Sequence, residues 1–264
     1  MAKNRKKLTR SQRRERRRKS IFVLPNLLTS ASLFAGFWAM IAAFEGRFVE
    51  SALAILISLV FDGLDGKVAR ATGTVSRFGV EYDSLADLVA FGVAPAVLFY
   101  LYALKPFGRL GFLAAFLFVA CGALRLARFN VQVETVGTKY FVGLPIPAAA
   151  SMLATTVLFL EELGLQRPVE HWPLVVMAYL LSFLMVSQIH YLSFKELGVA
   201  KLKSFNGLVA MLLCFILVAI EPQVMGFVLL ALYVLGGPFG ARYMAKKRAL
   251  AEPTPTLDDQ ANQA

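Results

Sequence analysis

The chain has 264 residues, of which 58% are hydrophobic and 17% charged, and its mean hydropathy is +0.62. Soluble domains are about half apolar and about a quarter charged, so this composition argues against a large soluble helical protein. Cys121 and Cys214 lie far apart in apolar segments and indicate neither a disulfide framework nor a cysteine metal site.

The net charge of +11 is concentrated at the N-terminus, where residues 1–19 contain eleven Lys or Arg residues and one acid, Glu15. Such a run is compatible with nucleic-acid binding, but its place beside an apolar segment favours a cytosolic membrane flank. We therefore expect residues 1–20 to form a basic cytosolic tail that attracts anionic lipid headgroups, and we expect no nucleic-acid partner. The tail lacks the features of a cleaved secretory signal, so we expect it to be retained.

Apolar runs of roughly twenty residues recur along the chain, and each is long enough to cross about 30 Å of hydrocarbon as a helix. We predict an all-α integral membrane protein, a bundle of about eight transmembrane helices with both termini cytosolic. The predicted segments are 21–44, 50–71, 78–103, 110–130, 142–163, 172–190, 204–220 and 223–243. Six spans with two re-entrant or interfacial segments would give the same orientation. The membrane domain is predicted over 21–246, and residues 247–264 are predicted to be a disordered tail.

Positive charges support this orientation. With the N-terminus inside, all but four of the 28 Lys and Arg residues fall on the cytosolic side. The exceptions are Arg47, Lys105, Arg109 and Arg167. This asymmetry predicts an even number of spans in the cell membrane. The chain shows no internal repeat, which argues against many secondary transporters.

Four aspartates mark the junction of the second and third predicted segments. Asp62 and Asp65 are spaced i, i+3, and Asp83 and Asp87 are spaced i, i+4, so each pair shares one helix face. The connection, residues 71–77, is short enough to make the two helices antiparallel neighbours. We therefore expect four carboxylates to converge in one polar pocket near the cytosolic face, and acids inside membrane segments indicate function.

Four carboxylates packed together repel one another unless cations neutralise them. Oxygen ligands suit Mg²⁺ or Mn²⁺, and four carboxylates are enough for two ions, which together can stabilise the entering and leaving oxygens of a displacement. The simpler alternative is that the acids only pair with Lys67, Arg70 and Arg77. Four acids at helical spacing exceed the needs of ordinary pairing.

Small residues accompany the aspartates. Gly66 and Ala69 lie one and two turns beyond the first aspartate on nearly the same face, and Gly79 lies one turn before the third. They leave room for a ligand to approach the helix backbone, although small residues also serve helix packing in membranes. Arg70 could reach a phosphate of such a ligand.

The pattern Asp62-Gly63-x-Asp65-Gly66-x-x-Ala69-Arg70, followed after eight residues by Gly79-x-x-x-Asp83-x-x-x-Asp87, resembles the signature of CDP-alcohol phosphotransferases without departure. The resemblance implies that Asp62, Asp65, Asp83 and Asp87 bind two divalent cations, with Asp62 and Asp83 bridging them. Asp87 would also be the general base for the acceptor hydroxyl. The resemblance further implies a homodimer.

The resemblance also implies a CDP site. Gly66, Arg70 and Ser76 would hold the CDP group, together with the small Ala69 and Gly79. The stretch Pro25-Asn26-Leu27-Leu28-Thr29 resembles the Pro-Asn stretch that lines this nucleotide site in the family. Its alternative interpretation is a helix start with Thr29 facing a neighbouring helix.

Three further stretches, Cys121–Asn130, Tyr140–Ala150 and Tyr191–Lys195, resemble the bacterial membrane-spanning class of phosphatidylserine synthases. This implies transfer from CDP-diacylglycerol to L-serine by direct displacement, releasing CMP. The cations at the cytosolic face could bind the serine carboxylate, and Asn130 its ammonium group, although positive-inside anchoring also explains each cation. The candidate serine-binding residues are Arg125, Arg128, Asn130, Lys139 and Lys195.

Two other functions stay open. The acceptor could be glycerol 3-phosphate or inositol phosphate, although the former would call for more phosphate-binding cations. A divalent-cation transporter lined by the aspartates would instead spread its acids across the membrane depth. A soluble-type synthase with His-x-Lys pairs is excluded, because neither His171 nor His190 begins that pattern.

Overall fold

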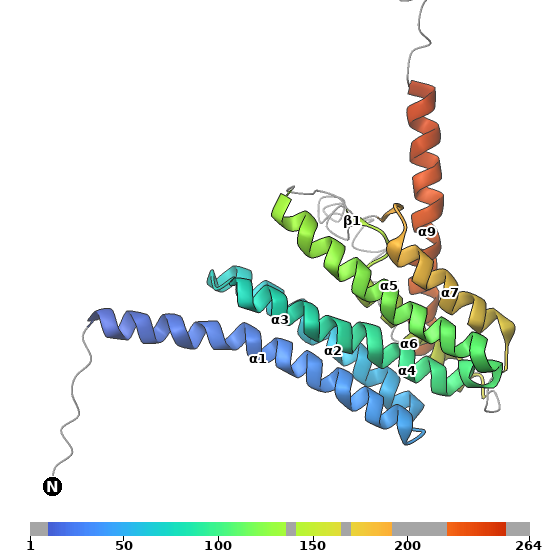
Figure 1. Cartoon of the computed structure of the whole chain (residues 1–264), viewed down its shortest axis with the longest axis horizontal. Helices are drawn as coiled ribbons and strands as arrows, with labels where there is room; N and C mark the ends of the chain where they lie inside the picture. Colours follow the sequence, from blue (N-terminus) through green and yellow to red (C-terminus); the bar gives the residue numbers. More distant parts are fainter. Residues whose placement is uncertain (1–9, 136–140, 165–169, 192–220, 252–264) are drawn as a thin grey trace, which may run out of the picture.

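The computed structural model describes residues 10–135, 141–164, 170–191 and 221–251. These residues form an all-helical bundle with one short strand pair (Figure 1). The α-helices are α1 (Arg10–Phe44), α2 (Phe48–Thr72), α3 (Arg77–Asp87), α4 (Ala94–Phe99), α5 (Gly108–Thr135), α6 (Ile146–Glu162), α7 (Trp172–Val186) and α9 (Pro222–Ala251). The π-helical turn η1 (Leu88–Val93) joins α3 to α4 as one continuous rod, and the π-helical turn η2 (Tyr100–Leu104) extends it. The 3₁₀ turn η3 (Lys105–Phe107) then leads into α5.

Seven of the eight predicted segments correspond to helices of the structure, and the remaining one, 204–220, lies outside the described residues. The stretches Val23–Phe44 and Arg77–Val131 are long and apolar enough to cross a membrane, and the second contains the turn η3. Trp172–Val186 and Pro222–Gly237 are apolar but shorter. The described residues thus form a helical protein with two stretches that could cross a membrane, while the bundle of eight spans and the cytosolic termini stay predictions.

Several predicted segment ends differ from the helix ends. The first helix, predicted from residue 21, begins at Arg10, so part of the predicted basic tail is helical. The segment predicted from residue 142 begins as a helix only at Ile146, because β1 (Phe141–Val142) precedes it and prolines stand at the helix start. The predicted disordered tail from 247 is helical as far as Ala251. Its Ala, Lys, Arg and Leu residues favour helix, and Pro253 follows shortly after.

The helices of the core pack closely through small residues. Gly36 of α1 lies against η1, so that a Cβ at this position would come within 2.6 Å of the Ala90 Cα atom. α1 also packs along α2, α3 and α4, and α9 packs on α6. Fully buried side chains such as Phe91 and Phe99 fill the centre of the bundle.

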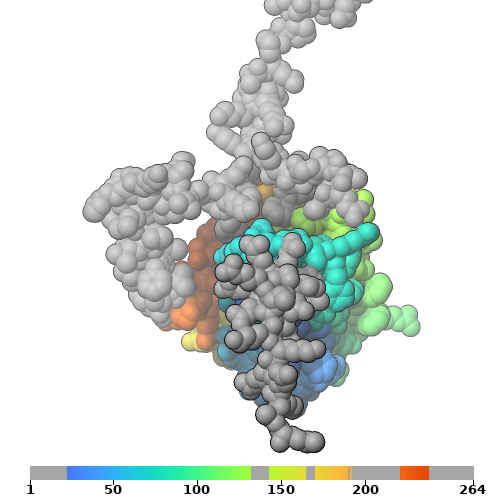
Figure 2. Space-filling model, turned by 90° about the vertical axis from the view of Figure 1, so that its left-hand side faces the viewer, coloured from blue at the N-terminus to red at the C-terminus, as the bar shows by residue number. Residues whose placement is uncertain are grey.

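The outward faces of the helices carry many large apolar side chains, among them Phe34 and Phe37 of α1, Ile57 of α2 and Phe116 of α5. An apolar surface of this extent is unfavourable in water and suits lipid. Figure 2 looks onto the end of the molecule where α3 begins and shows the surface of α3 beside that of α5.

Candidate active site

The site is built on the hairpin between α2 and α3. α2 ends at Thr72, and the left-handed Gly73 (φ 62°) caps it by donating its N–H to the carbonyls of Ala69 and Arg70. Ser76 begins the next helix: its hydroxyl accepts a hydrogen bond of 3.0 Å from the Gly79 N–H. These two caps hold the connection tight, and they bring the acids of α2 and α3 to the same place.

Three of the predicted aspartates form a cluster. Asp62, Asp83 and Asp87 each direct one carboxylate oxygen to a common place, and these oxygens lie within 4.8 Å of one another. Asp83 Oδ1 is buried and has no hydrogen-bond partner in the described part of the chain. A buried anionic oxygen without a donor is unfavourable, and a cation would satisfy it. The donor set, carboxylate oxygens alone, fits Mg²⁺ or Mn²⁺.

The fourth aspartate, Asp65, stands beside this group. It is 5% exposed, and its Oδ2 atom accepts a hydrogen bond of 2.7 Å from the Thr29 hydroxyl of α1. It interacts electrostatically with Asp62 and Asp83 and with the guanidinium of Arg70. Asp65 thereby connects the carboxylate cluster to α1.

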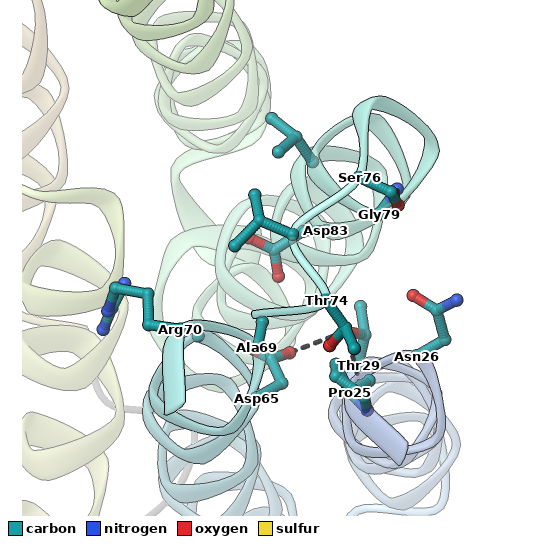
Figure 3. A pocket seen from close by; sticks show the side chains of 13 residues that line it. Pro25, Asn26, Thr29, Asp65, Ala69, Arg70, Thr74, Ser76, Gly79 and Asp83 are labelled. Atoms are coloured by element: carbon teal, nitrogen blue, oxygen red, sulfur yellow. Dashed lines mark hydrogen bonds between the residues drawn. The ribbon is translucent and has the colours of Figure 1, made fainter. Parts of the chain in front are cut away.

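A cavity of about 160 Å³ opens between α1, α2 and α3 (Figure 3). Asp65 and Asp83 are part of its wall, so it lies directly beside the carboxylate cluster. The structure brings all of the predicted nucleotide-binding residues to this cavity, namely Pro25, Asn26, Thr29, Gly66, Ala69, Arg70, Ser76 and Gly79. Sequence reasoning missed Thr74, Val75 and Val80, whose positions in or next to the α2–α3 connection were the available signal.

Two glycines of the cavity wall leave little room for a side chain. A Cβ on Gly79 would lie 3.1 Å from Ser76 Oγ and 3.5 Å from Asn26 Oδ1, and a Cβ on Gly66 would lie 3.4 Å from Arg70 Nη1. A side chain at Gly79 would therefore narrow the passage between α1 and α3. The exposed Arg70 side chain extends away from Thr29 and Asn26 in Figure 3, so it borders the cavity rather than filling it.

The predicted acceptor residues of α5 are not part of the wall of this cavity. Arg125 is largely buried and interacts electrostatically with Asp87 and with Tyr233 of α9, a residue that sequence reasoning missed. The Asn130 amide donates a hydrogen bond of 3.0 Å to the hydroxyl of Ser84, which follows Asp83 on α3. Half-buried Arg128 lies between them on α5, and Lys139 and Lys195 lie outside the described residues.

The arrangement has distinct chemical parts. The cavity is lined by small and polar groups that suit a nucleotide, and the cluster beside it can hold divalent cations. Asp87 belongs to this cluster and also interacts electrostatically with a cation, Arg125, which is not part of the cavity wall. A ligand held between the two sides would place a phosphorus at the carboxylates and an anionic co-substrate near the guanidinium.

Comparison with known proteins agrees with this geometry. A family model described as CDP-alcohol phosphatidyltransferase matches residues 22–184. A CDP-diacylglycerol–serine O-phosphatidyltransferase from Helicobacter pylori is 40% identical over 82% of this chain and 90% of its own length. A protein of the same name from Methanocaldococcus jannaschii is 36% identical over 76% of this chain and 87% of its own length. An archaetidylserine synthase from Methanothermobacter thermautotrophicus is 39% identical over 65% of this chain and 70% of its own length. The chain belongs to the CDP-alcohol phosphatidyltransferase family.

Proposed function

We propose that this protein transfers the phosphatidyl group of CDP-diacylglycerol to L-serine and so forms phosphatidylserine and CMP. The observation that carries the proposal is the position of Asp87. This aspartate belongs to the carboxylate cluster beside the cavity and also interacts with Arg125, a cation suited to the carboxylate of serine. The names of the similar proteins agree with serine as the acceptor.

In this proposal Asp62, Asp65, Asp83 and Asp87 hold two divalent cations, Mg²⁺ or Mn²⁺. The shared position of three carboxylates and the unsatisfied Asp83 Oδ1 support it. Bound cations would neutralise the diphosphate and stabilise the oxygens that enter and leave the phosphorus. Thr29 keeps the Asp65 carboxylate in place through its hydrogen bond. The cavity residues of α1, α2 and α3 bind the CDP group.

The transfer is one displacement. The serine hydroxyl oxygen attacks the phosphorus that carries the diacylglycerol, and a new oxygen–phosphorus bond forms. The bond from that phosphorus to the bridging oxygen breaks, and its electron pair leaves with CMP. Asp87 accepts the hydroxyl proton as general base, and no covalent bond to the protein forms. Asp87 suits this role because it faces α5, where the acceptor would bind.

The acceptor side is assigned by charge and hydrogen bonding. Arg125 binds the serine carboxylate, and Asn130, held by Ser84, offers its amide oxygen to the ammonium group. Arg128, Lys139 and Lys195 complete the positive surroundings at the entrance.

We further propose that the protein spans the cell membrane several times with its active site near the cytosolic face, and that it works as a homodimer. The concentration of Lys and Arg on one side supports this orientation. The basic residues that precede the first apolar stretch would then lie at the surface of anionic lipids.

The test is CMP release from CDP-diacylglycerol in detergent micelles by purified protein with Mn²⁺ or Mg²⁺. Four acceptor conditions are compared: L-serine, glycerol 3-phosphate, inositol phosphate and none. We expect release to require L-serine and phosphatidylserine to form in equal amount. Release that only another alcohol stimulates would retain the family and discard serine. No release with any alcohol from folded, metal-loaded protein would overturn the enzymatic proposal and favour cation transport.

A further inference from the structure

A side-chain hydrogen bond joins α1 to α3 beside the cavity. The hydroxyl oxygens of Ser30 and Tyr82 lie 2.8 Å apart, and both residues are partly buried. The Ser30 hydroxyl also donates a hydrogen bond of 2.8 Å to the carbonyl of Asn26. Because a serine hydroxyl has a single proton, the Tyr82 hydroxyl is the donor in the bond to Ser30. We call this contact the Ser30–Tyr82 clasp.

The two residues of the clasp are not part of the cavity wall, yet each is the direct neighbour of a residue that is. Ser30 follows Thr29 on α1, and Tyr82 precedes Asp83 on α3. Asp83 also belongs to the carboxylate cluster. A shift of either helix at the clasp would therefore move the cavity wall and one of the aspartates.

The clasp lies on the seam along which α1 and α3 meet at the edge of the cavity. A Cβ on Gly79 would lie 3.5 Å from Asn26 Oδ1, so the two helices are already close at this level. In Figure 3 both residues lie on the side of the cavity away from Arg70. Ser30 and Tyr82 follow one helical turn further along, four residues after Asn26 and three after Gly79. A change in the separation of α1 and α3 at the clasp would thus change the width of the cavity.

The ring of Tyr82 is also held on its own helix. Phe78 lies one turn earlier on α3, and the two rings stack with their centroids 6.0 Å apart at an interplanar angle of 11°. This stack restricts the direction in which the phenol can point. Replacement of Tyr82 by Phe would keep the stack and delete only the hydroxyl.

α1 is bound to α2 by separate hydrogen bonds. The Thr29 hydroxyl donates to Asp65 Oδ2 at 2.7 Å, and the hydroxyl oxygens of Ser32 and Ser58 lie 2.8 Å apart. Thr29 and Ser32 are spaced i, i+3 and share one face of α1, whereas Ser30 is turned from Thr29 by about 100°. Loss of the clasp would therefore leave α1 bound to α2 and release only the seam with α3.

We propose that Ser30 and Tyr82 are positioning residues for the nucleotide: the clasp holds α1 at the distance from α3 at which the cavity accepts the CDP group. The proposal rests on the proposed function in one respect, that this cavity binds CDP. When only a fraction of the protein has the binding shape, the apparent Kd rises by the inverse of that fraction. The bound complex, once formed, is the same. The clasp should therefore affect the affinity for CDP-diacylglycerol and leave kcat unchanged.

The test measures the Kd for CDP-diacylglycerol in detergent micelles with Mn²⁺ and without an acceptor. The Kd is obtained from the rise of the unfolding temperature with ligand concentration, relative to each variant's own ligand-free value. We expect Ser30→Ala and Tyr82→Phe each to raise the Kd about three- to tenfold, the range for losing one hydrogen bond between neutral groups. In the CMP-release assay, kcat and the KM for L-serine should change less than about twofold.

Two matched controls remove the same chemical groups elsewhere. Ser32→Ala deletes a hydroxyl of α1 that bonds Ser58 of α2, away from the cavity wall. Tyr179→Phe deletes a phenol hydroxyl that donates to the Leu110 carbonyl at 3.0 Å. Both should keep the Kd within about twofold of wild type, even where the ligand-free unfolding temperature falls. A control that raises the Kd as much as the clasp variants would overturn the proposal.

The double variant Ser30→Ala/Tyr82→Phe separates a direct contact from two independent effects. If the two hydroxyls act through one bond, the double variant should have the Kd of the weaker-binding single variant. Multiplied effects would overturn the clasp. So would clasp variants that match the controls, or variants that lose kcat together with the affinities for both substrates.

Failure of the proposed function would be visible separately, because the binding measurement contains no acceptor. If CDP-diacylglycerol stabilises the wild-type protein but L-serine does not stimulate CMP release, only the acceptor is wrong, and the Kd values still decide on the clasp. If CDP-diacylglycerol does not stabilise the wild-type protein at any concentration, the cavity is not the CDP site and the clasp proposal falls with it.

Discussion

The proposed nucleotide side and the proposed acceptor side of this site are built in different ways. Pro25–Asp87, one continuous piece of chain, supplies every residue of the cavity and of the carboxylate cluster. The proposed acceptor side lies on α5, whose Arg125 interacts electrostatically with Asp87 of α3 and with Tyr233 of α9, a helix far away in the sequence. A family that keeps its nucleotide and changes its alcohol benefits from this division, because acceptor residues can vary without disturbing the metal and phosphate chemistry.

Asp87 is where the two sides meet, and its replacement is expected to have the largest effect. Asp87→Asn removes the proposed base and one proposed metal ligand, so CMP release should fall at least roughly 10³-fold with every acceptor. The measurement is initial CMP release in micelles. Glu81→Gln, an exposed acid on the same helix, is the matched control and should retain activity. A folded Asp87→Asn protein with more than about a tenth of wild-type activity would contradict the assignment.

Metal binding should be a property of the nucleotide side alone. Mn²⁺ at about a hundred times its Kd should stabilise the wild-type protein by about 2.7 kcal/mol against unfolding, and EDTA should reverse this. Asp83→Asn removes the negative charge and replaces one carboxylate oxygen with an amide nitrogen, so it should lose most of the stabilisation, whereas Asn130→Ala should keep it. Thermal unfolding in detergent, with and without Mn²⁺, provides the measurement. Equal stabilisation of Asp83→Asn and wild type would place the ion elsewhere.

A single methyl group added to the cavity wall should weaken the binding of CDP-diacylglycerol. Gly79→Ala places a Cβ 3.1 Å from Ser76 Oγ and 3.5 Å from Asn26 Oδ1, which narrows the passage between α1 and α3. We expect the KM for CDP-diacylglycerol to rise about tenfold while the KM for the acceptor stays constant. Gly236→Ala is the control, since a Cβ there meets nothing within 4 Å. An unchanged KM for the nucleotide lipid would show that CDP binds outside this cavity.

A substitution on the proposed acceptor side should raise the KM for the acceptor and leave the KM for CDP-diacylglycerol unchanged. Its effect should be smaller than that of Gly79→Ala. Asn130→Ala removes the amide that bonds Ser84, and we expect about a three- to fivefold rise in the KM for L-serine at constant KM for CDP-diacylglycerol. Gln223→Ala, which removes an amide at the start of α9, serves as the control. Kinetic titration of each substrate at saturation of the other gives both constants. If Asn130→Ala changed both constants alike, the two sides would not be separate.

Much of the nucleotide side was predictable because its geometry is local. Helical spacing puts each aspartate pair on one face, and the short connection makes the two helices neighbours. The sequence did not reveal that Ser76 also caps α3 or that Thr29 binds Asp65, because both depend on where α1 and the hairpin meet. The helical extension of α9 to Ala251 was missed because a polar composition was taken as disorder.

The sequence by itself determined the class of fold, the pairing of the aspartates and most of the residues of the cavity wall. Hydrophobic length and i, i+3 and i, i+4 spacing are properties of a single helix or hairpin, and they hold before any distant contact forms. Only the tertiary structure decided that Arg125 of α5 interacts with both Asp87 of α3 and Tyr233 of α9, and that Tyr191 of β2 (His190–Tyr191) packs against α9 at Gly237. These contacts join segments separated by many tens of residues, and no periodicity within either segment encodes the packing that brings them together.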